Sequence, residues 1–315
     1  MKTRIWSALI AIYLAWGSTY LAIHYAVQSI PPFFMTGTRF LVAGLILYTW
    51  RRLAGDPAPT VAQWRSGLTM GSLLLVGGIG GVSWAEQFLP SGISALVVAA
   101  SPLWVVLVDA LRPGGKRPNL ITMMGVLVGL AGIFILINPG KTTGGAQGYN
   151  VLGLAVLILA ALSWALGSLY SHTADQPKSA LLGTGIQLLA GSAGSFLVGL
   201  VSGESRQLNL TAISLPSLAG LAYLIVVGSL IGFVCFTWLL RVAPTTLVVT
   251  HAYVNQVVAV MLGSLLAQEA LTAKILAAAP LILSAVVLIQ VRKADQPVEK
   301  VVEEITLRKA EEEPC

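Results

Sequence analysis

Polar side chains within otherwise apolar stretches are the residues of this chain that could bind a small molecule. Arg39 lies several residues inside one such stretch, too deep to be a simple flanking charge. A guanidinium there needs a wet cavity, a carboxylate or an anionic ligand, because burying an unpaired charge is costly. Snorkelling towards an interface, or pairing with a backbone carbonyl, is the alternative interpretation.

A second polar group lies in a later apolar stretch. His251 and Asn255 are four residues apart and share one face of a helix, with Tyr253 and Gln256 beside them. Uncharged imidazole, amide and phenol groups can bind the carboxylate, amine or ring of a zwitterion, and a histidine could also carry a proton. The alternative is that these groups hydrogen-bond between packed helices.

Aromatic faces of similar composition occur twice. Residues spaced by four line one helical face in each case, namely Trp16, Tyr20 and His24, and then Trp164, Ser168 and His172. Two such faces could form two walls of one cavity, although Trp and Tyr also anchor helices at membrane interfaces. For the two histidines, a place near a helix end is the favoured interpretation.

Hydroxyl groups and one proline extend this candidate site. Ser18 lies beside the first aromatic face, and Ser101 follows Ser94 by seven residues, which aligns the two on a helix. Pro102 frees a backbone carbonyl one turn earlier and could act as a hinge. A structural kink alone is an equal alternative.

Two carboxylates adjoin the apolar stretches. Glu86 lies near the outer end of one stretch and is interpreted as solvated, with pairing to Arg39 or proton transfer as alternatives. Asp109 lies beside Arg112 and is expected to mark a helix end. Three scattered histidines, and two cysteines without ligand spacing, predict neither a metal site nor a cofactor.

Ten apolar stretches carry or adjoin these groups. Of the 315 residues, 56% are hydrophobic and 10% are charged, and each stretch approaches the roughly 20 residues that a helix needs to cross a bilayer. Short connections leave no room for a soluble catalytic domain. Because backbone groups in lipid must be satisfied within each segment, the chain is predicted to be an all-α membrane protein with helices at 5–27, 33–50, 66–87, 91–111, 119–138, 151–172, 180–201, 215–239, 245–266 and 273–291.

The basic residues predict the orientation of these helices. The net charge of +6 comes from scattered clusters and not from a nucleic-acid-binding stripe. With the N-terminus inside, only Lys141, Arg206 and Lys274 lie on the outer side and Arg39 lies within a span, so fifteen of the 19 Lys and Arg residues lie on the inner side. Because cytoplasmic loops retain positive charge, both termini are expected to be cytoplasmic.

An internal repeat divides the chain. The motif Gly17-Ser18-Thr19-Tyr20 recurs 150 residues later as Gly167-Ser168-Leu169-Tyr170, and Pro90 and Pro244 introduce a second pair of similar segments. The repeat predicts two five-helix halves, residues 1–140 and 141–291, followed by a charged cytoplasmic tail at 292–315. An odd number of helices per half would insert the second half upside down, as in secondary transporters with a site between inverted repeats.

Several longer motifs complete the pattern: Trp16-Gly17-Ser18-Thr19-Tyr20, Arg39-Phe40, Pro90-Ser91-Gly92, Ser101-Pro102-Leu103-Trp104, Trp164-Ala165-Leu166-Gly167-Ser168 and Tyr253-Val254-Asn255. In these motifs the chain, from residue 5 to about 291, resembles the EamA-like transporters of the bacterial drug/metabolite transporter superfamily. The resemblance implies ten helices, two inverted EamA domains, and export of small metabolites or amino acids across the inner membrane. Asn255-Gln256 departs from the family's usual Asn-Pro, and Gln268-Glu269 from its Gly-Glu.

These features favour a secondary transporter that alternates access around a site between its halves. Its substrates would be amino acids or related zwitterionic or neutral compounds, since multiply charged substrates would need more fixed positive charge. A membrane-embedded enzyme would need a catalytic constellation, and a channel would need rings of like charge or a filter sequence. The expected partners are the lipid bilayer and a small-molecule substrate, without nucleic acid, and a homodimer stays open. The predicted substrate-binding residues are Trp16, Ser18, Tyr20, Arg39, Ser101, Trp164, Ser168, His251, Tyr253, Asn255 and Gln256, with Pro102 as a hinge.

Overall fold

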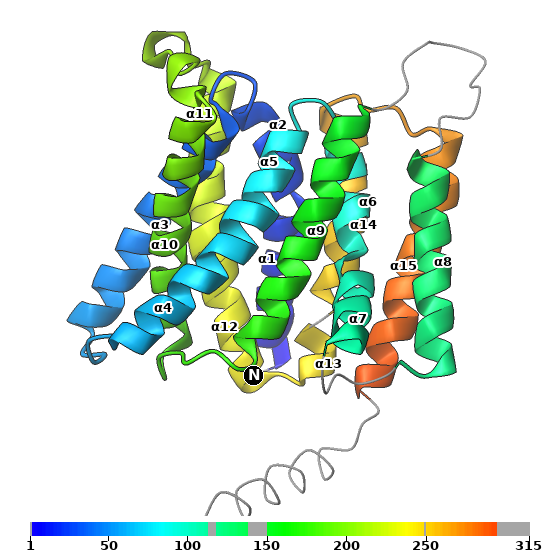
Figure 1. The fold of residues 1–315 in the computed structure, drawn as a ribbon, viewed down its shortest axis with the longest axis horizontal. Helices are drawn as coiled ribbons and strands as arrows, with labels where there is room; N and C mark the ends of the chain where they lie inside the picture. The colour runs from blue at the N-terminus through cyan, green and yellow to red at the C-terminus, as the bar shows by residue number, and fades with distance from the viewer. Residues whose placement is uncertain (1, 113–117, 138–149, 249, 295–315) are drawn as a thin grey trace, which may run out of the picture.

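Helices account for the architecture of this chain. The computed structural model describes residues 2–112, 118–137, 150–248 and 250–294, which contain no β-strand. The helices run side by side in one bundle, with the N-terminus at one end (Figure 1). Seven helical runs are long and apolar enough to cross a membrane, and three shorter apolar helices complete the ten predicted spans. The all-α fold class is therefore confirmed, and the tail predicted at 292–315 lies outside the described residues beyond Ala294.

The first half contributes five spans. The first consists of α1 (Lys2–Gly17) and α2 (Thr19–Ala26), and the second is α3 (Pro32–Leu53). The third combines α4 (Val61–Met70), the π-helix η1 (Gly71–Gly80) and α5 (Gly81–Ala85). The fourth is divided into α6 (Ser91–Ala99) and α7 (Ser101–Leu111), and the fifth is α8 (Leu120–Ile137).

The second half also contributes five. The sixth and seventh spans are α9 (Val151–Ser171) and α10 (Ala180–Val201), followed by the 3₁₀ turns η2 (Glu204–Arg206) and η3 (Leu210–Ala212). The eighth combines α11 (Leu215–Tyr223), the π-helix η4 (Leu224–Ile231) and α12 (Gly232–Val242). The ninth comprises α13 (Thr245–Val248) and α14 (His251–Leu266), and the tenth is α15 (Ala273–Ala294).

Local sequence sets where several of these helices begin. At α4, the Thr60 hydroxyl accepts a hydrogen bond from the Gln63 N–H, and the Gln63 side chain accepts one from the Thr60 N–H. This capping box satisfies two backbone donors that the helix leaves free. Pro32 and Pro102 occupy the first turns of α3 and α7, where a missing N–H costs nothing.

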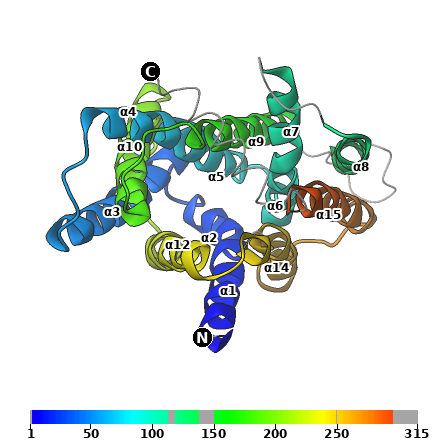
Figure 2. The same ribbon diagram turned by 90° about the horizontal axis from the view of Figure 1, so that it is seen from below.

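Helices of the two halves pair reciprocally. α3 of the second span packs on α10 of the seventh, and α8 of the fifth packs on α15 of the tenth. Likewise, η1 of the third span packs on α9 of the sixth, and α1 of the first packs on α12 of the eighth. If each span is replaced by its counterpart in the other half, the first two contacts stay the same. The contact between the third and sixth spans becomes the contact between the eighth and first spans. Figure 2 shows the α8 and α15 pair at one edge of the bundle.

Glycines allow the closest approaches between helices. A Cβ on Gly71 of η1 would lie 2.7 Å from the Gln187 carbonyl oxygen and 2.8 Å from the Gly191 nitrogen, both backbone atoms of α10. A Cβ on Gly81 would lie 2.9 Å from the Cβ of Ala160 in α9. At both positions, the absence of a side chain lets the helices approach this closely.

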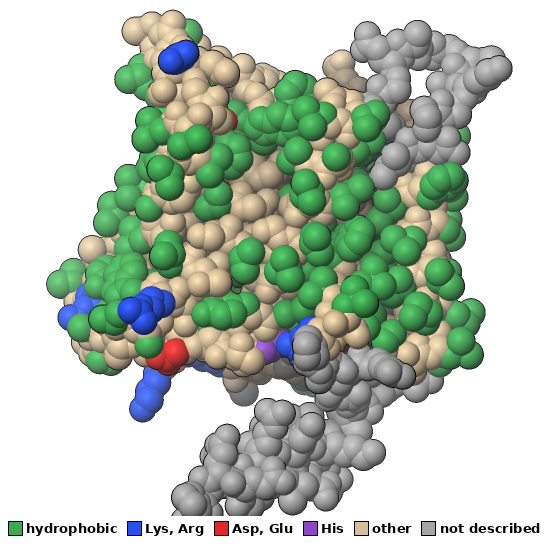
Figure 3. Space-filling view, viewed as in Figure 1, with side chains coloured by type: hydrophobic (Ala, Val, Ile, Leu, Met, Phe, Trp, Pro, Cys, Tyr) green, Lys and Arg blue, Asp and Glu red, His purple; other side chains and the backbone are tan. Residues whose placement is uncertain are grey.

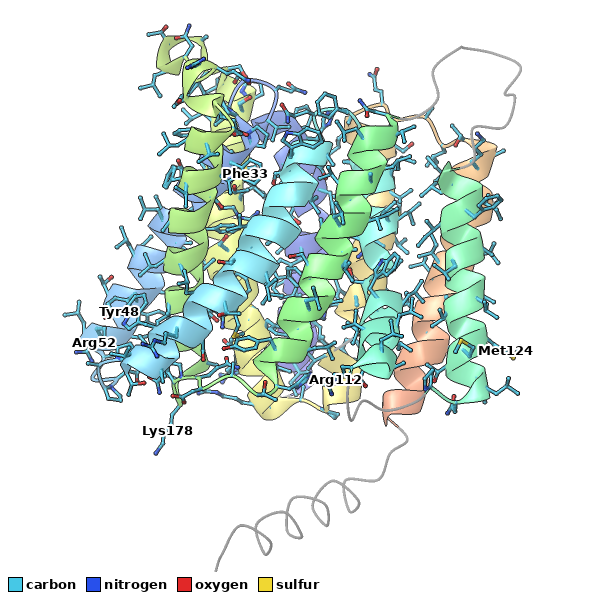
Figure 4. The ribbon with its side chains drawn as sticks, viewed as in Figure 1. Phe33, Tyr48, Arg52, Arg112, Met124 and Lys178 are labelled. Carbon is cyan, nitrogen blue, oxygen red and sulfur yellow. The ribbon has the colours of Figure 1, made fainter. Side chains whose placement is uncertain are left out.

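Charged side chains are distributed unequally between the two ends of the bundle. Figure 3 shows apolar side chains over the visible side and most of the visible Lys and Arg near the lower end. Figure 4 places Arg52, Arg112 and Lys178 at that end, which is also the end of the N-terminus. We call this end the basic face, and the other end, near Phe33, the opposite face.

Candidate functional site

Arg39 is buried where α3 meets η4. The residue is 4% exposed, and its Nε donates a hydrogen bond to the Ser229 hydroxyl at 2.9 Å. Its Nη2 lies beside Gly228, at 3.0 Å from the position that a Cβ there would occupy. The alternative of snorkelling to an interface is wrong, because the side chain stays inside the bundle.

No carboxylate balances this cation within the described residues. Two basic residues do have carboxylate partners, Arg51 with Asp56 and Arg112 with Asp109, and both pairs lie on the basic face. Pairing of Arg39 with Glu86, one of the alternatives from the sequence, is not observed. A buried guanidinium without a counter-ion is costly to the protein alone and attractive to an anionic ligand.

Trp16 joins three helices next to Arg39. Its indole Nε1 donates to the Gly228 carbonyl at 3.0 Å, which links it to the glycine beside the guanidinium. Its ring centroid lies 5.1 Å from that of His251, 5.1 Å from Phe236 and 5.7 Å from Phe233. The structure therefore brings together predicted residues from the first, second and ninth spans.

His251 is oriented by its own helix start. Its Nδ1 lies 2.8 Å from the Val248 carbonyl, and its ring also packs 5.4 Å from that of Phe236. Tyr253 lies half-buried on the same helix.

Ser18 and Ser101 lie at helix interruptions. The Ser18 hydroxyl, between α1 and α2, donates to the Leu14 carbonyl at 2.6 Å and lies 2.6 Å from the Tyr223 hydroxyl. The Ser101 hydroxyl donates to the Val98 carbonyl at 2.6 Å, at the interruption between α6 and α7. The fourth span is thus broken immediately before Pro102, where a hinge or kink was predicted. A substrate-binding role for both serines stays a prediction.

Trp164 packs against η1 in the way that Trp16 packs against η4. Its ring lies 3.0 Å from the position of a Cβ on Gly78, and the neighbouring Ser163 hydroxyl donates to the Leu73 carbonyl at 2.7 Å. Ser168 lies half-buried one turn further along α9. Each aromatic face therefore contacts a π-helical segment of the opposite half, and their meeting around one cavity stays a prediction.

A second buried polar cluster surrounds Glu86. Tyr20 of α2 lies beside the Gln256 side chain of α14 and close to Glu86. Asn255 and Gln256 are buried, and their side-chain oxygens have no hydrogen-bond partner. We call Tyr20, Glu86 and Gln256 the Glu86 cluster.

The interpretation of Glu86 as a solvated carboxylate is wrong. The residue is 2% exposed, and neither carboxyl oxygen has a hydrogen-bond partner among the residues that the structure describes. Glu86 directly follows α5, so its place in the sequence suggested the membrane surface. Tyr20 of the first span lies close to it, and the position of Glu86 along the chain could not reveal its burial.

Two carboxylates bridge the halves at the opposite face. The sequence did not predict this role for either of them. Glu269 accepts hydrogen bonds from the Ser91 N–H at 2.7 Å, the Ser91 hydroxyl at 2.7 Å and the Gly92 N–H at 3.0 Å. Glu204 accepts from the N–H groups of Phe33 at 2.9 Å and Phe34 at 3.2 Å. Each caps a helix of the first half, where the helix dipole favours negative charge.

The sequence contained a weak signal for these two caps. α3 and α6 start after Pro31 and Pro90, and neither has a capping side chain of its own. Free N–H groups at such a start require an acceptor from elsewhere in the chain. Which residue supplies it depends on the packing of the two halves.

Two shallow grooves lie on the outside of the bundle. One, of about 370 Å³, lies between α4 and α10, and the other, of about 340 Å³, lies between α3 and the run from η4 to α12. Neither groove is lined by a predicted site residue. The Arg39 surroundings and the Glu86 cluster lie inside the bundle instead.

Comparisons with known proteins agree with this architecture. The model of the EamA-like transporter family matches at residues 4–138 and 151–291. The uncharacterized inner membrane transporter YedA of Escherichia coli is 36% identical over 302 residues, which cover 95% of this chain and 94% of that protein. Protein PecM of Dickeya dadantii is 28% identical over 286 residues, covering 87% and 88%. A crystal structure that is 20% identical has a TM-score of 0.59, covers 92% of this chain and 98% of its own, and supports the fold alone.

Proposed function

Because the chain belongs to the EamA-like transporter family, we propose that it is a secondary transporter that exports small metabolites by alternating access. The proposed location is the inner membrane, as the name of YedA states for that relative. Both termini would face the cytoplasm. The halves at 1–140 and 141–291 would form the two inverted repeats.

The observation that carries the substrate proposal is the unpaired guanidinium of Arg39. One buried positive charge matches one carboxylate, and a bound carboxylate would supply the counter-ion that the protein lacks. Uncharged groups beside it, such as Trp16 and His251, can contact the remainder of a substrate without adding fixed charge. We therefore propose amino acids and related zwitterionic compounds as the substrates.

Reciprocal helix pairing supports the proposed inversion. Each half contains one span with a π-helical segment, η1 in the third and η4 in the eighth, and each segment contacts a tryptophan of the other half. π-helical turns often lie at functional sites. A substrate site between inverted repeats would then lie between two equivalent elements, as alternating access requires.

The transport proposal can be tested by counterflow in proteoliposomes. Vesicles loaded with unlabelled amino acids should take up the same labelled amino acids in a saturable manner, and the corresponding decarboxylated amines should exchange far less. Arg39→Gln should abolish the exchange, whereas Arg51→Gln, a surface control on the same helix, should retain it. A flux that does not saturate, equal exchange of the amines, or full activity of Arg39→Gln would contradict the proposal.

A further inference from the structure

Glu86 is the buried acid that the proposed substrate site does not use. It is enclosed at the end of α5, and both of its carboxyl oxygens lack a hydrogen-bond donor. The amide oxygen of nearby Gln256 lacks a donor as well. A carboxylate that is buried without a hydrogen-bond donor is so unfavourable that a group in this position binds a proton instead.

The charge closest to Glu86 also favours its neutral, protonated form. Tyr20 of α2 lies close to Glu86, and the negative charge of Glu269 disfavours a second negative charge nearby. On the helices packed against α5, α9 carries no Asp, Glu, Lys, Arg or His, and Arg39 of α3 is bound to Ser229. Glu86 is therefore surrounded by an oxygen acceptor without a donor, that of Gln256, and by the nearby negative charge of Glu269.

Glu269 lies near Glu86 and also joins the two halves at the opposite face. Its three hydrogen bonds attach the loop before α15, in the second half, to the start of α6 in the first half. Near these bonds, the Tyr25 hydroxyl donates to the Leu266 carbonyl at 3.0 Å, which also joins the halves. An ionised Glu86 would repel Glu269 and would require water, and both effects oppose this closed arrangement.

We propose that Glu86 is a proton-binding site whose protonation closes the opposite face, so that the transport cycle is coupled to protons. The proton would bind to a carboxyl oxygen of Glu86 from water when this face is open. For the cycle to be coupled, it would leave to water on the side of the basic face, once the bundle opens there. This inference rests on the proposed alternating access.

Spin-label distances across the closed face test the inference. Labels at Phe88→Cys and Leu271→Cys, two exposed positions on either side of the Glu269 bonds, would be placed in a Cys235→Ser, Cys315→Ser background. Between about pH 5 and pH 9, wild type should convert from a short to a long label distance. Glu86→Gln, a neutral side chain of equal size, should keep the short distance throughout, and Asp175→Asn, at an exposed carboxylate between α9 and α10, should respond as wild type does.

Glu269→Gln supplies a second variant that keeps Glu86 and removes the repelling charge. Because glutamine has one acceptor oxygen in place of two, it also weakens the Glu269 bonds, so its label distance should be longer than that of wild type at low pH and should change less with pH. A wild-type distance that does not change with pH, or a Glu86→Gln transition like that of wild type, would overturn the inference. Counterflow in the same preparation separates the two proposals: exchange without a pH-dependent distance overturns only proton coupling, and absence of exchange overturns transport.

Discussion

At the residue scale, the burial of Arg39 and the burial of Glu86 each cost free energy of folding. Both are buried, one without a carboxylate partner and the other without any hydrogen-bond donor among the described residues. Removing the Arg39 charge relieves a desolvation cost that its hydrogen bond to Ser229 and its contact with the Phe40 ring offset only in part. Proteins retain such groups where function uses them. We therefore expect stability and activity to respond in opposite directions at these positions.

Arg39→Met should separate these two responses. Methionine retains much of the side-chain length without the charge, so the melting temperature should rise by about 2 °C or more, while counterflow is lost. Thermal unfolding of the purified protein in detergent measures the first effect. Arg51→Met breaks a half-buried ion pair at the surface of the bundle and should change the melting temperature little. A lower melting temperature for Arg39→Met would show that the charge is balanced in the fold.

At the scale of elements, helix starts in the first half depend on acceptors from the second half. α3 relies on Glu204 and α6 on Glu269 for bonds that their own N-terminal residues do not supply. The π-helical segments depend equally on the other half, because η1 is in backbone contact with α10. Neither half is therefore expected to keep these elements intact alone.

Glu204→Ala should destabilise the protein by about 1–2 kcal/mol, because two N–H groups of α3 would lose their acceptor. Burial raises the pKa of Glu204 above its ordinary value, against the opposing effect of the Phe34 and Phe33 hydrogen bonds. A pKa that is higher in the folded than in the unfolded state makes stability fall as pH rises through that interval. Glu204→Gln should weaken this pH dependence, as melting temperatures between about pH 4 and pH 7 would reveal. An unchanged pH profile in Glu204→Gln would contradict the assignment.

Gly71→Ala should cost about 1–3 kcal/mol, because its Cβ would meet rigid backbone atoms of α10. Gly183→Ala is the matched control within a helix, since its nearest neighbour would lie at an ordinary 3.6 Å. That variant should be neutral or more stable by up to about 1 kcal/mol. Equal melting temperatures for the two variants would exclude the close η1 to α10 contact.

At the scale of the whole molecule, the basic face determines the expected orientation in the membrane. Arg52, Arg112 and Lys178 lie at the end of the bundle that carries the N-terminus. Because positive loops remain in the cytoplasm during insertion, this end should face inward. The Glu204 and Glu269 bonds would then close the outer side of the protein.

Cysteine labelling in intact cells tests this orientation. In the Cys235→Ser, Cys315→Ser background, Leu210→Cys in the exposed η3 turn should react with a membrane-impermeant maleimide. Lys178→Cys, exposed on the basic face, should react only after the cells are permeabilised. The reverse pattern would invert the proposed topology.

The sequence by itself determined where the ten spans lie, and it also marked the end of α7. Whether a stretch enters a bilayer depends on its own composition and length, so local pattern is sufficient. Asp109 was interpreted as the marker of a helix end, and it pairs with Arg112 at 2.6 Å just where α7 stops. Interruptions within spans were less visible, because the break at Ser18 and the π-helical segments change hydrogen bonding and not hydropathy.

Only the tertiary structure decided which polar groups meet. Arg39 and Ser229 are 190 residues apart, and Glu269 and Ser91 are 178 apart. Hydropathy records how deeply a residue lies in the membrane and carries no information about which helix faces it. The burial of Glu86 and the missing counter-ion of Arg39 follow from the packing of the two halves, and the proposed chemistry of the protein depends on both.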